Sequence, residues 1–201
     1  MNSHLIVDLF VEDRAHEEFL KALIARIARE ENIKAEIRVR SARGGHGRAI
    51  SEYELYQVLL EKGRIYQNPD LIVVAIDGNC STFKRKRDEI QNATQDLFKD
   101  RLVTACPDPH IEKWYLADPA SFHQVVGTLP KVGKRKCQRD YYKSLLVQAI
   151  RNSGYPITLG GIEFAPELTS AMDLYRACHN HHCLKAFVDE LRAKFRQGNQ
   201  T

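Results

Sequence analysis

Three acidic residues, Glu12, Asp77 and Glu112, each follow a short apolar segment of this sequence. If the three segments are parallel strands, their carboxyl ends share one edge of a sheet and the carboxylates converge there. Carboxylates in close contact repel one another unless a cation neutralises them, and their oxygen atoms suit Mg²⁺ or Mn²⁺. The pattern therefore predicts a divalent-cation site, against the simpler interpretation that each acid is an exposed loop residue or a helix cap.

The segments that would position these acids alternate between strand and helix patterns. Runs of β-branched and apolar residues predict strands at residues 4–11, 35–40, 71–76 and 101–105. The 71–76 run is apolar on both faces, as expected of a central strand in a covered parallel sheet. Helices are expected at residues 50–62 and after the start signals Asp13, Ser81, Asp108-Pro109 and Asp118-Pro119. Such alternation implies parallel strands joined by right-handed helical crossovers.

The strand patterns stop after Phe122, and the remainder of the chain is helical in pattern. Helical segments are expected at residues 141–151, 167–176 and 184–195. At 201 residues there is little room for two independent cores. We therefore expect an α/β fold, a parallel sheet with flanking helices, in which residues 1–122 form the core and residues 123–201 form a helical extension packed on it.

The overall composition is that of an ordinary globular protein, with 43% hydrophobic and 28% charged residues. No stretch approaches about 18 consecutive apolar residues, so neither a transmembrane helix nor a membrane partner is expected. The first residues lack the pattern of a secretory signal. Five scattered cysteines predict reduced thiols and a cytoplasmic location. The net charge of +4 is compatible with a polyanionic partner without demonstrating one.

Two further features have a structural and a functional interpretation. Cys178 and Cys183 enclose three histidines, which raises the question of a zinc site. A compact hexapeptide does not easily wrap a tetrahedral ion, so we favour a connection between two helices. Trp114 is expected in the core rather than as a platform for base stacking.

Three groups of basic residues could hold a nucleic-acid backbone, and for each of them a solvated surface or a flexible connection is the alternative. They are Lys84, Arg85, Lys86 and Arg87 after Asp77; Lys134, Arg135 and Lys136 within the basic stretch 131–143; and Arg43 and Arg48 in a glycine-rich link. Tyr141 and Tyr142 interleave with the second group and could stack on bases. The glycine-rich link could place backbone N–H groups around a phosphate at a helix start, but it lacks the pattern of a Walker A loop.

Several short motifs resemble those of a known family. Phe10-Val11-Glu12-Asp13 and Ile76-Asp77-Gly78-Asn79 resemble the glutamate and Asp-x-Asp motifs of Toprim domains, and residues 107–119 resemble a segment of small Toprim-like proteins. The resemblance implies metal-dependent cleavage or joining of phosphodiesters, with Glu12 and Asp77 holding the metal. These proteins are often associated with ABC-type or OLD-like ATPases in phage defence, which implies an ATPase partner subunit and a role in antiviral defence.

Asn79 departs from the motif, because it stands where the second acid is expected. An amide oxygen can bind Mg²⁺ but brings no charge, so metal binding should weaken and a second ion becomes less favoured. Asn79 could instead contact a metal-bound water or a phosphate. The sequence leaves these alternatives open.

The leading hypothesis is a metal-dependent nuclease acting on DNA or RNA. Glu12, Asp77 and Asn79 would hold Mg²⁺ or Mn²⁺, and Glu112 is the candidate base. One alternative, which Asn79 favours, is a non-catalytic Toprim-like module that binds nucleic acid or an ATPase. Another is a phosphoryl-transfer enzyme acting on nucleotides, since a fold does not by itself fix a function.

Overall fold

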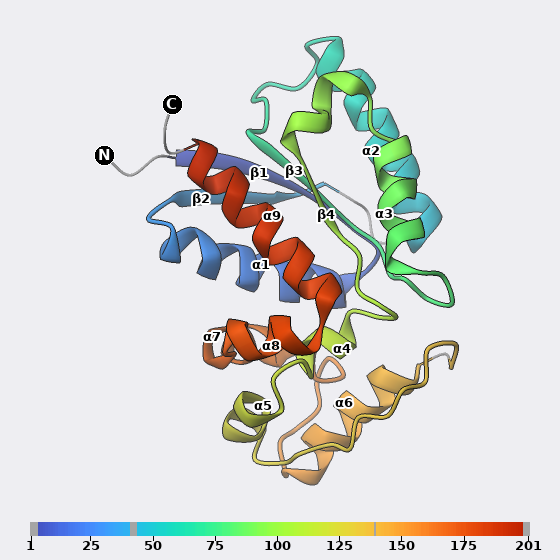
Figure 1. Ribbon diagram of the computed structural model, residues 1–201, viewed down its shortest axis with the longest axis vertical. Helices are drawn as coiled ribbons and strands as arrows, with labels where there is room; N and C mark the ends of the chain where they lie inside the picture. The colour runs from blue at the N-terminus through green and yellow to red at the C-terminus, as the bar shows by residue number, and fades with distance from the viewer. Residues whose placement is uncertain (1–3, 41–43, 139, 199–201) are drawn as a thin grey trace.

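The centre of the molecule is a four-stranded parallel sheet. The computed structural model describes residues 4–40, 44–138 and 140–198 (Figure 1). The strands are β1 (His4–Val11), β2 (Lys34–Val39), β3 (Leu71–Ala75) and β4 (Leu102–Ala105), in the spatial order β2-β1-β3-β4. All three strand pairs are parallel. The expected α/β fold with a parallel sheet and flanking helices is therefore confirmed.

Helices cover both faces of the sheet, which gives three layers (Figure 1). The helices that cover it are α1 (Arg14–Glu30) and α9 (His182–Gly198) on one face, and α2 (His46–Glu61) and α3 (Phe83–Asn92) on the other. Alternation along β1 explains the division, because Val7 and Leu9 belong to the cluster with α1 and α9 whereas Phe10 packs with α2. A 3₁₀ helix, Asp96–Arg101, leads into β4.

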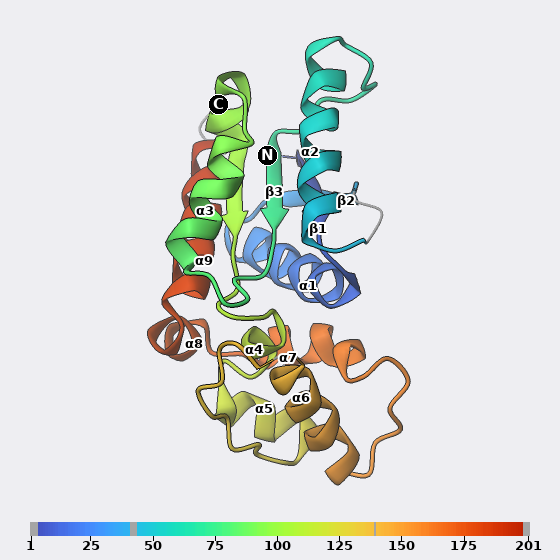
Figure 2. The ribbon, with the colours of Figure 1, turned by 90° about the vertical axis from the view of Figure 1, so that its right-hand side faces the viewer.

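The remaining helices lie beyond the carboxyl ends of the strands, where they face the sheet edge that carries the candidate site (Figure 2). They are α4 (Glu112–Tyr115), α5 (Pro119–Val126), α6 (Tyr141–Asn152), the 3₁₀ turn Ile162–Phe164, α7 (Ala165–Ala171) and α8 (Leu174–Asn180). None of the helices in the described part of the chain has the length and apolar character needed to cross a membrane.

The C-terminal helices share one hydrophobic core with the sheet. Trp114 is fully buried, as expected, and its ring stacks on Phe187 of α9 at 5.8 Å and lies 6.1 Å from Phe19 of α1. Its indole N–H donates to the Cys183 sulfur at 3.3 Å. Aromatic contacts of this kind join elements from both ends of the chain around one centre.

Three expected helix boundaries are wrong. The helix expected at Asp108-Pro109 begins only at Glu112, because the backbone from Pro107 to Ile111 is used in contacts with the loop after β3. The expected 167–176 helix is broken at Asp173, which caps α8 by accepting from the Arg176 backbone N–H. Thr82, not Ser81, caps α3 in the same way.

Candidate active site

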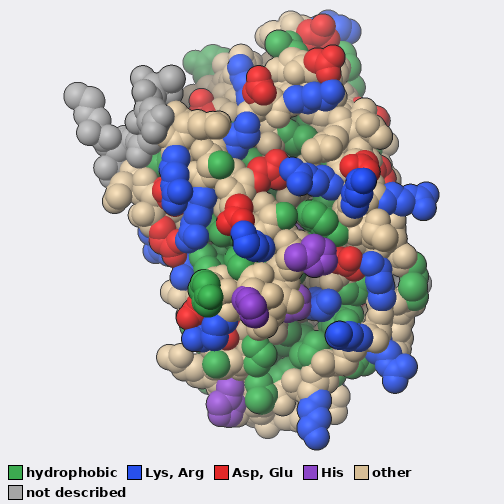
Figure 3. Space-filling model, in the orientation of Figure 1, with side chains coloured by type: hydrophobic (Ala, Val, Ile, Leu, Met, Phe, Trp, Pro, Cys, Tyr) green, Lys and Arg blue, Asp and Glu red, His purple; other side chains and the backbone are tan. Residues whose placement is uncertain are grey.

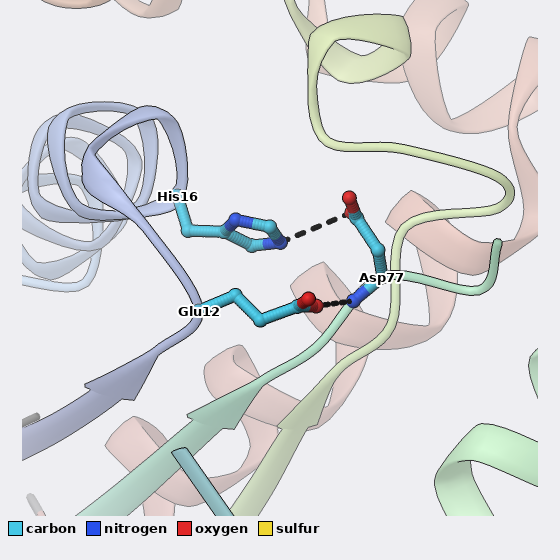
Figure 4. Close-up of side chains that lie close together, drawn as sticks. All are labelled: Glu12, His16 and Asp77. Carbon is cyan, nitrogen blue, oxygen red and sulfur yellow. Dashed lines mark hydrogen bonds and ion pairs between the residues drawn. The ribbon is translucent and has the colours of Figure 1, made fainter. Parts of the chain in front are cut away.

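Glu12 and Asp77 lie side by side because β1 and β3 are neighbours in register. Val11 pairs with Ala75, so the residues that follow each strand end at the same edge. The Glu12 Oε2 atom accepts a hydrogen bond from the Asp77 backbone N–H at 2.5 Å (Figure 4). The structure thus brings together two of the three acids for which the sequence predicted a shared site. Glu112, the third, is not in the group of described residues whose donor atoms could share one ion.

A histidine that the sequence reasoning missed completes this group. His16 lies in the first turn of α1 and is fully buried. Asp13, the helix cap, accepts from the His16 backbone N–H at 3.0 Å and lies 2.8 Å from the ring Nδ1. The other ring nitrogen, Nε2, points toward Asp77 and lies 3.1 Å from its Oδ1 (Figure 4). The available signal was the position of His16 one helical turn after Glu12, just inside a capped helix start.

Asp77 is also contacted from the loop that follows β4. Its Oδ1 accepts from the Ile111 backbone N–H at 2.9 Å, and its Oδ2 lies 3.1 Å from His110 Nδ1. Burial alone would raise the pKa of Asp77, but the charge of His16 and the contact with His110 outweigh it and leave this pKa below its ordinary value. Asp77 is therefore held as a carboxylate.

Gly78 allows the loops after β3 and β4 to touch. Its backbone N–H donates to the Pro107 carbonyl at 2.7 Å, and a Cβ atom at this position would lie 2.9 Å from that oxygen. A larger residue would push the loops apart. The contact brings His110 and Ile111 to Asp77, so the glycine next to the acid is part of how the site is built.

The charge state of His16 is set by its two acidic neighbours. Burial by itself would lower the pKa of His16, but the Asp77 carboxylate and the bond to Asp13 raise it well above the ordinary value. Conversely, His16 lowers the pKa of Asp13 to about 2, against the effect of burial. When no metal is bound, an imidazolium at His16 neutralises the acids around it.

In contrast to Asp13 and Asp77, the other two acids, Glu12 and Glu112, have raised pKa values. Burial raises the pKa of Glu12, and Asp77 adds to this effect. Burial also raises the pKa of Glu112, the first residue of α4, again with a contribution from the Asp77 charge. One edge of the sheet thus carries an ionised carboxylate beside two carboxyls that take up protons more readily, a combination typical of acid–base chemistry.

The donor atoms of Glu12, His16 and Asp77 lie within 4.8 Å of one another and could hold one divalent ion. His16 Nε2 is buried and has no well-aligned hydrogen bond, which leaves its lone pair available once the ring loses its proton. Imidazole with carboxylates suits Mn²⁺ and other transition ions better than it suits Mg²⁺. Among the described His, Cys, Asp and Glu residues, no second group meets this geometry.

One protein-family model covers most of the chain. Residues 11–192 match the family model described as a domain of unknown function, DUF4276. The chain belongs to the DUF4276 family. The matched range contains Glu12, His16, Asp77 and Glu112. No match was found among curated proteins or among solved structures.

Asn79 lies apart from the three donor residues of this DUF4276 chain. It is exposed, in the left-handed region with φ 50°, and its side-chain amide is 3.5 Å from the Asp77 carbonyl oxygen. The structure therefore brings His16, and not Asn79, to Glu12 and Asp77.

The basic run on α3 of the DUF4276 chain does not form one surface, because successive helical residues point about 100° apart. Lys86 contacts Glu89 at 3.0 Å and His46 at 3.2 Å, while Arg87 faces Glu190 of α9 at 3.5 Å. Lys84 and Arg85 are exposed, and within the described residues no acid pairs with either of them.

Of the glycine-rich link, only the part after residue 43 belongs to the described structure. Arg43 lies outside the described residues, and Arg48 is exposed and bound to Glu52 at 2.9 Å. The Gly45 backbone N–H donates to the Glu12 carbonyl at 3.1 Å, so the link runs beside the site.

The second basic group of the DUF4276 chain, Lys134, Arg135 and Lys136, lies in the loop between α5 and α6. Cys137 in this loop forms a disulfide with Cys80 in the loop after β3. The expectation of reduced thiols is therefore wrong for this pair, which is 57 residues apart in sequence and meets only through the fold. Figure 1 shows the two loops near each other beside α3 and α6.

The Cys178–Cys183 segment joins α8 to α9, as favoured from the sequence. Cys183 is buried and accepts from the Trp114 indole, and Cys178 is half-buried with a free thiol. Neither cysteine belongs to the single metal-compatible group found among the described residues.

Proposed function

We propose that this protein is a metal-dependent nuclease that hydrolyses phosphodiester bonds at the carboxyl edge of its sheet. The observation that carries the proposal is the group of Glu12, His16 and Asp77, with a buried imidazole nitrogen free of a well-aligned hydrogen bond. Mn²⁺ is the favoured ion and Mg²⁺ the alternative. When bound, the ion would supply Lewis-acid polarisation of a non-bridging phosphoryl oxygen.

The protein's own groups divide the remaining work. Asp77 is fixed by Ile111 and His110, so it offers its charge at a defined position. Glu112 has a raised pKa at the same edge and is our candidate to accept the proton of the attacking water. Lys84 and Arg85, together with the loop residues Lys134–Lys136, would bind phosphate groups of the substrate.

A non-catalytic role is the second candidate, and one observation favours it. Both Asp77 oxygens already face protein donors, and His16 can neutralise the acids without a metal. A module of this kind would bind nucleic acid or a partner protein without cutting.

The biological setting that we propose rests on the resemblance of the motifs to Toprim proteins. It comprises an ABC- or OLD-type ATPase subunit as partner, and antiviral defence. The cytoplasmic location that we also propose rests instead on the scattered cysteines, of which Cys106, Cys178 and Cys183 are free. Affinity purification of the tagged chain from its native host should recover an ATPase. Recovery of the chain alone under gentle lysis would contradict this part of the proposal.

The activity test uses labelled DNA and RNA pools with Mn²⁺, Mg²⁺ or EDTA. We expect cleavage only with a divalent ion, complete loss of cleavage in Asp77→Asn, and slowing of about 10²–10⁴-fold in Glu112→Gln, the usual contribution of a general base. Asp96→Asn is the matched control, because Asp96 is exposed and bound to Lys99 in the 3₁₀ turn before β4. Binding without cleavage under every condition would favour the non-catalytic module.

A further inference from the structure

We propose that a basic pocket beside the candidate active site binds the terminal phosphate of a nucleic-acid substrate. The pocket has a volume of about 250 Å³ and lies between the α5–α6 loop, α4 and the α8–α9 junction. Its charged lining residues are Lys113, Lys134, Arg135, Lys136 and Asp108. This inference rests on the proposed function, because it names the end chemistry of the substrate that the same site would cut.

The charges of the pocket are out of balance. Four cationic side chains face a single carboxylate, a net charge of +3 without the histidines. Asp108 already forms an ion pair with Lys136, whose Nζ lies 2.8 Å from the Asp108 Oδ1 atom. Within the described residues, Lys134 and Arg135 have no acidic partner. Cations gathered in a hollow repel one another unless an anion joins them, so the pocket is suited to a group of high negative charge.

The excess of cations in the pocket is not a general feature of the protein surface. Figure 3 shows basic side chains spread over the face that carries α9, with acidic side chains between them. The pocket is different because its cations come from two separate elements, Lys113 from α4 and the rest from one loop. Of the two histidines that line the pocket, His181 adds no charge near neutral pH, since burial and the charge of Lys113 lower its pKa to about 4.

Lys113 and the loop that carries the other cations are held in place by contacts within the protein. Lys113 Nζ donates to the Asp108 carbonyl at 3.1 Å and lies 5.8 Å from the Tyr142 ring. The Tyr142 hydroxyl donates to the Gly133 carbonyl at 3.1 Å. The disulfide from Cys137 to Cys80 ties the same loop to the segment that follows Asp77. Such preorganisation lowers the cost of binding.

The pocket and the acidic group both use the β4–α4 loop. Asp108 and Pro109 line the pocket, whereas His110 contacts Asp77. Two residues of chain span at most about 7 Å. A phosphate in the pocket would therefore lie close to the phosphodiester at Asp77. We favour a terminal phosphate monoester over an internal diester, because the monoester carries close to two negative charges and offers three acceptor oxygens.

Binding is measured in EDTA, so that no chemistry takes place. Short oligonucleotides with a 5′-phosphate, a 3′-phosphate or hydroxyl ends are compared by fluorescence anisotropy on the full chain. We expect one phosphorylated end to bind at least about tenfold more tightly than the hydroxyl ends, the usual range for hydrogen bonds to a charged group. Inorganic phosphate should compete with that end.

The Lys134→Gln/Arg135→Gln variant should lose this preference. Lys62→Gln/Arg64→Gln is the matched control, because it removes the same charges from exposed positions at the end of α2 and should keep the preference. Equal binding of phosphorylated and hydroxyl ends, or equal loss of the preference in both variants, would overturn the inference. A preserved preference without cleavage in Mn²⁺ would reject the nuclease proposal alone, and cleavage that ignores the terminal phosphate would reject the pocket alone.

Discussion

The acidic group and the basic pocket share the β4–α4 loop, yet the charges are balanced by protein groups in the first and left unbalanced in the second. Asp77 receives contacts from His16, His110 and the Ile111 backbone, all within the protein. In the pocket, only one of the four cations has an acid beside it. The acidic group is therefore expected to stabilise the fold, whereas the pocket keeps a net positive charge that, in our proposal, a bound anion balances. We therefore expect substitutions in the acidic group to lower the free energy of unfolding, and substitutions in the pocket to change nucleic-acid binding instead.

The largest effect is expected for Asp77→Ala. This change removes the ion pair of the buried His16 with Asp77 and keeps the one with Asp13, and breaking a buried ion pair costs about 3–5 kcal/mol. Urea unfolding in EDTA measures the loss in free energy of unfolding. Asp96→Ala is the control, for which no measurable change is expected since that acid is exposed. A stable Asp77→Ala protein would show that the acidic group is no more structural than the pocket.

Most of the fold could be predicted from the sequence, because strand and helix patterns depend on neighbouring residues. The boundaries that failed depend on distant partners. Asp173 breaks the expected helix while its backbone N–H donates to Asp118 at 2.9 Å, a contact across 55 residues. The Asp108-Pro109 start signal failed because the loop contacts Asp77 and Gly78 instead.

The part of the site that lies directly at the strand ends could be predicted from the sequence. Glu12 and Asp77 converge because parallel neighbouring strands end together, and this needed only the strand assignment. His16 and His110 were missed because their contacts with Asp77 depend on how α1 and the β4–α4 loop pack. The pocket was missed for the same reason, since Lys113 is separated in sequence from Lys134 and Arg135.

The second largest effect is expected on metal binding, and it tests which side chains bind the ion. His16→Gln should weaken Mn²⁺ binding by at least about tenfold, within the range for altered metal-site residues. Asn79→Asp should change the affinity much less, because the Asn79 side chain lies apart from the donor group. Isothermal titration calorimetry at one pH compares the three proteins. A large gain in Mn²⁺ affinity in Asn79→Asp, with no loss of affinity in His16→Gln, would contradict this assignment. It would mean that the ion is bound by Glu12, Asp77 and the residue at position 79, as expected from the sequence.

Proton binding at His16 should make the acidic group, but not the pocket, sensitive to alkaline pH. Because the folded-state pKa of His16 is raised above 6.5, its ion pairs contribute fully below that pH and are lost as pH rises through the folded value. In EDTA, the difference in unfolding free energy between wild type and His16→Gln should therefore shrink from about pH 6 toward alkaline pH. A difference that stays constant over this range would mean that His16 does not carry the charge.

The smallest effect on stability is expected in the pocket. Lys134→Gln/Arg135→Gln removes two exposed cations that have no acidic partner among the described residues, so the free energy of unfolding should stay within about 0.5 kcal/mol of wild type. The same variant should still change how nucleic-acid binding responds to salt. Each lost phosphate contact lowers the slope of log K against log salt by about 0.7–0.9, so two contacts give a measurable difference. Anisotropy titrations at several salt concentrations, with Lys62→Gln/Arg64→Gln as control, measure this slope. A clear loss of stability with an unchanged slope would mean that these cations support the fold, as the acidic group does, and the contrast between the two regions would fail.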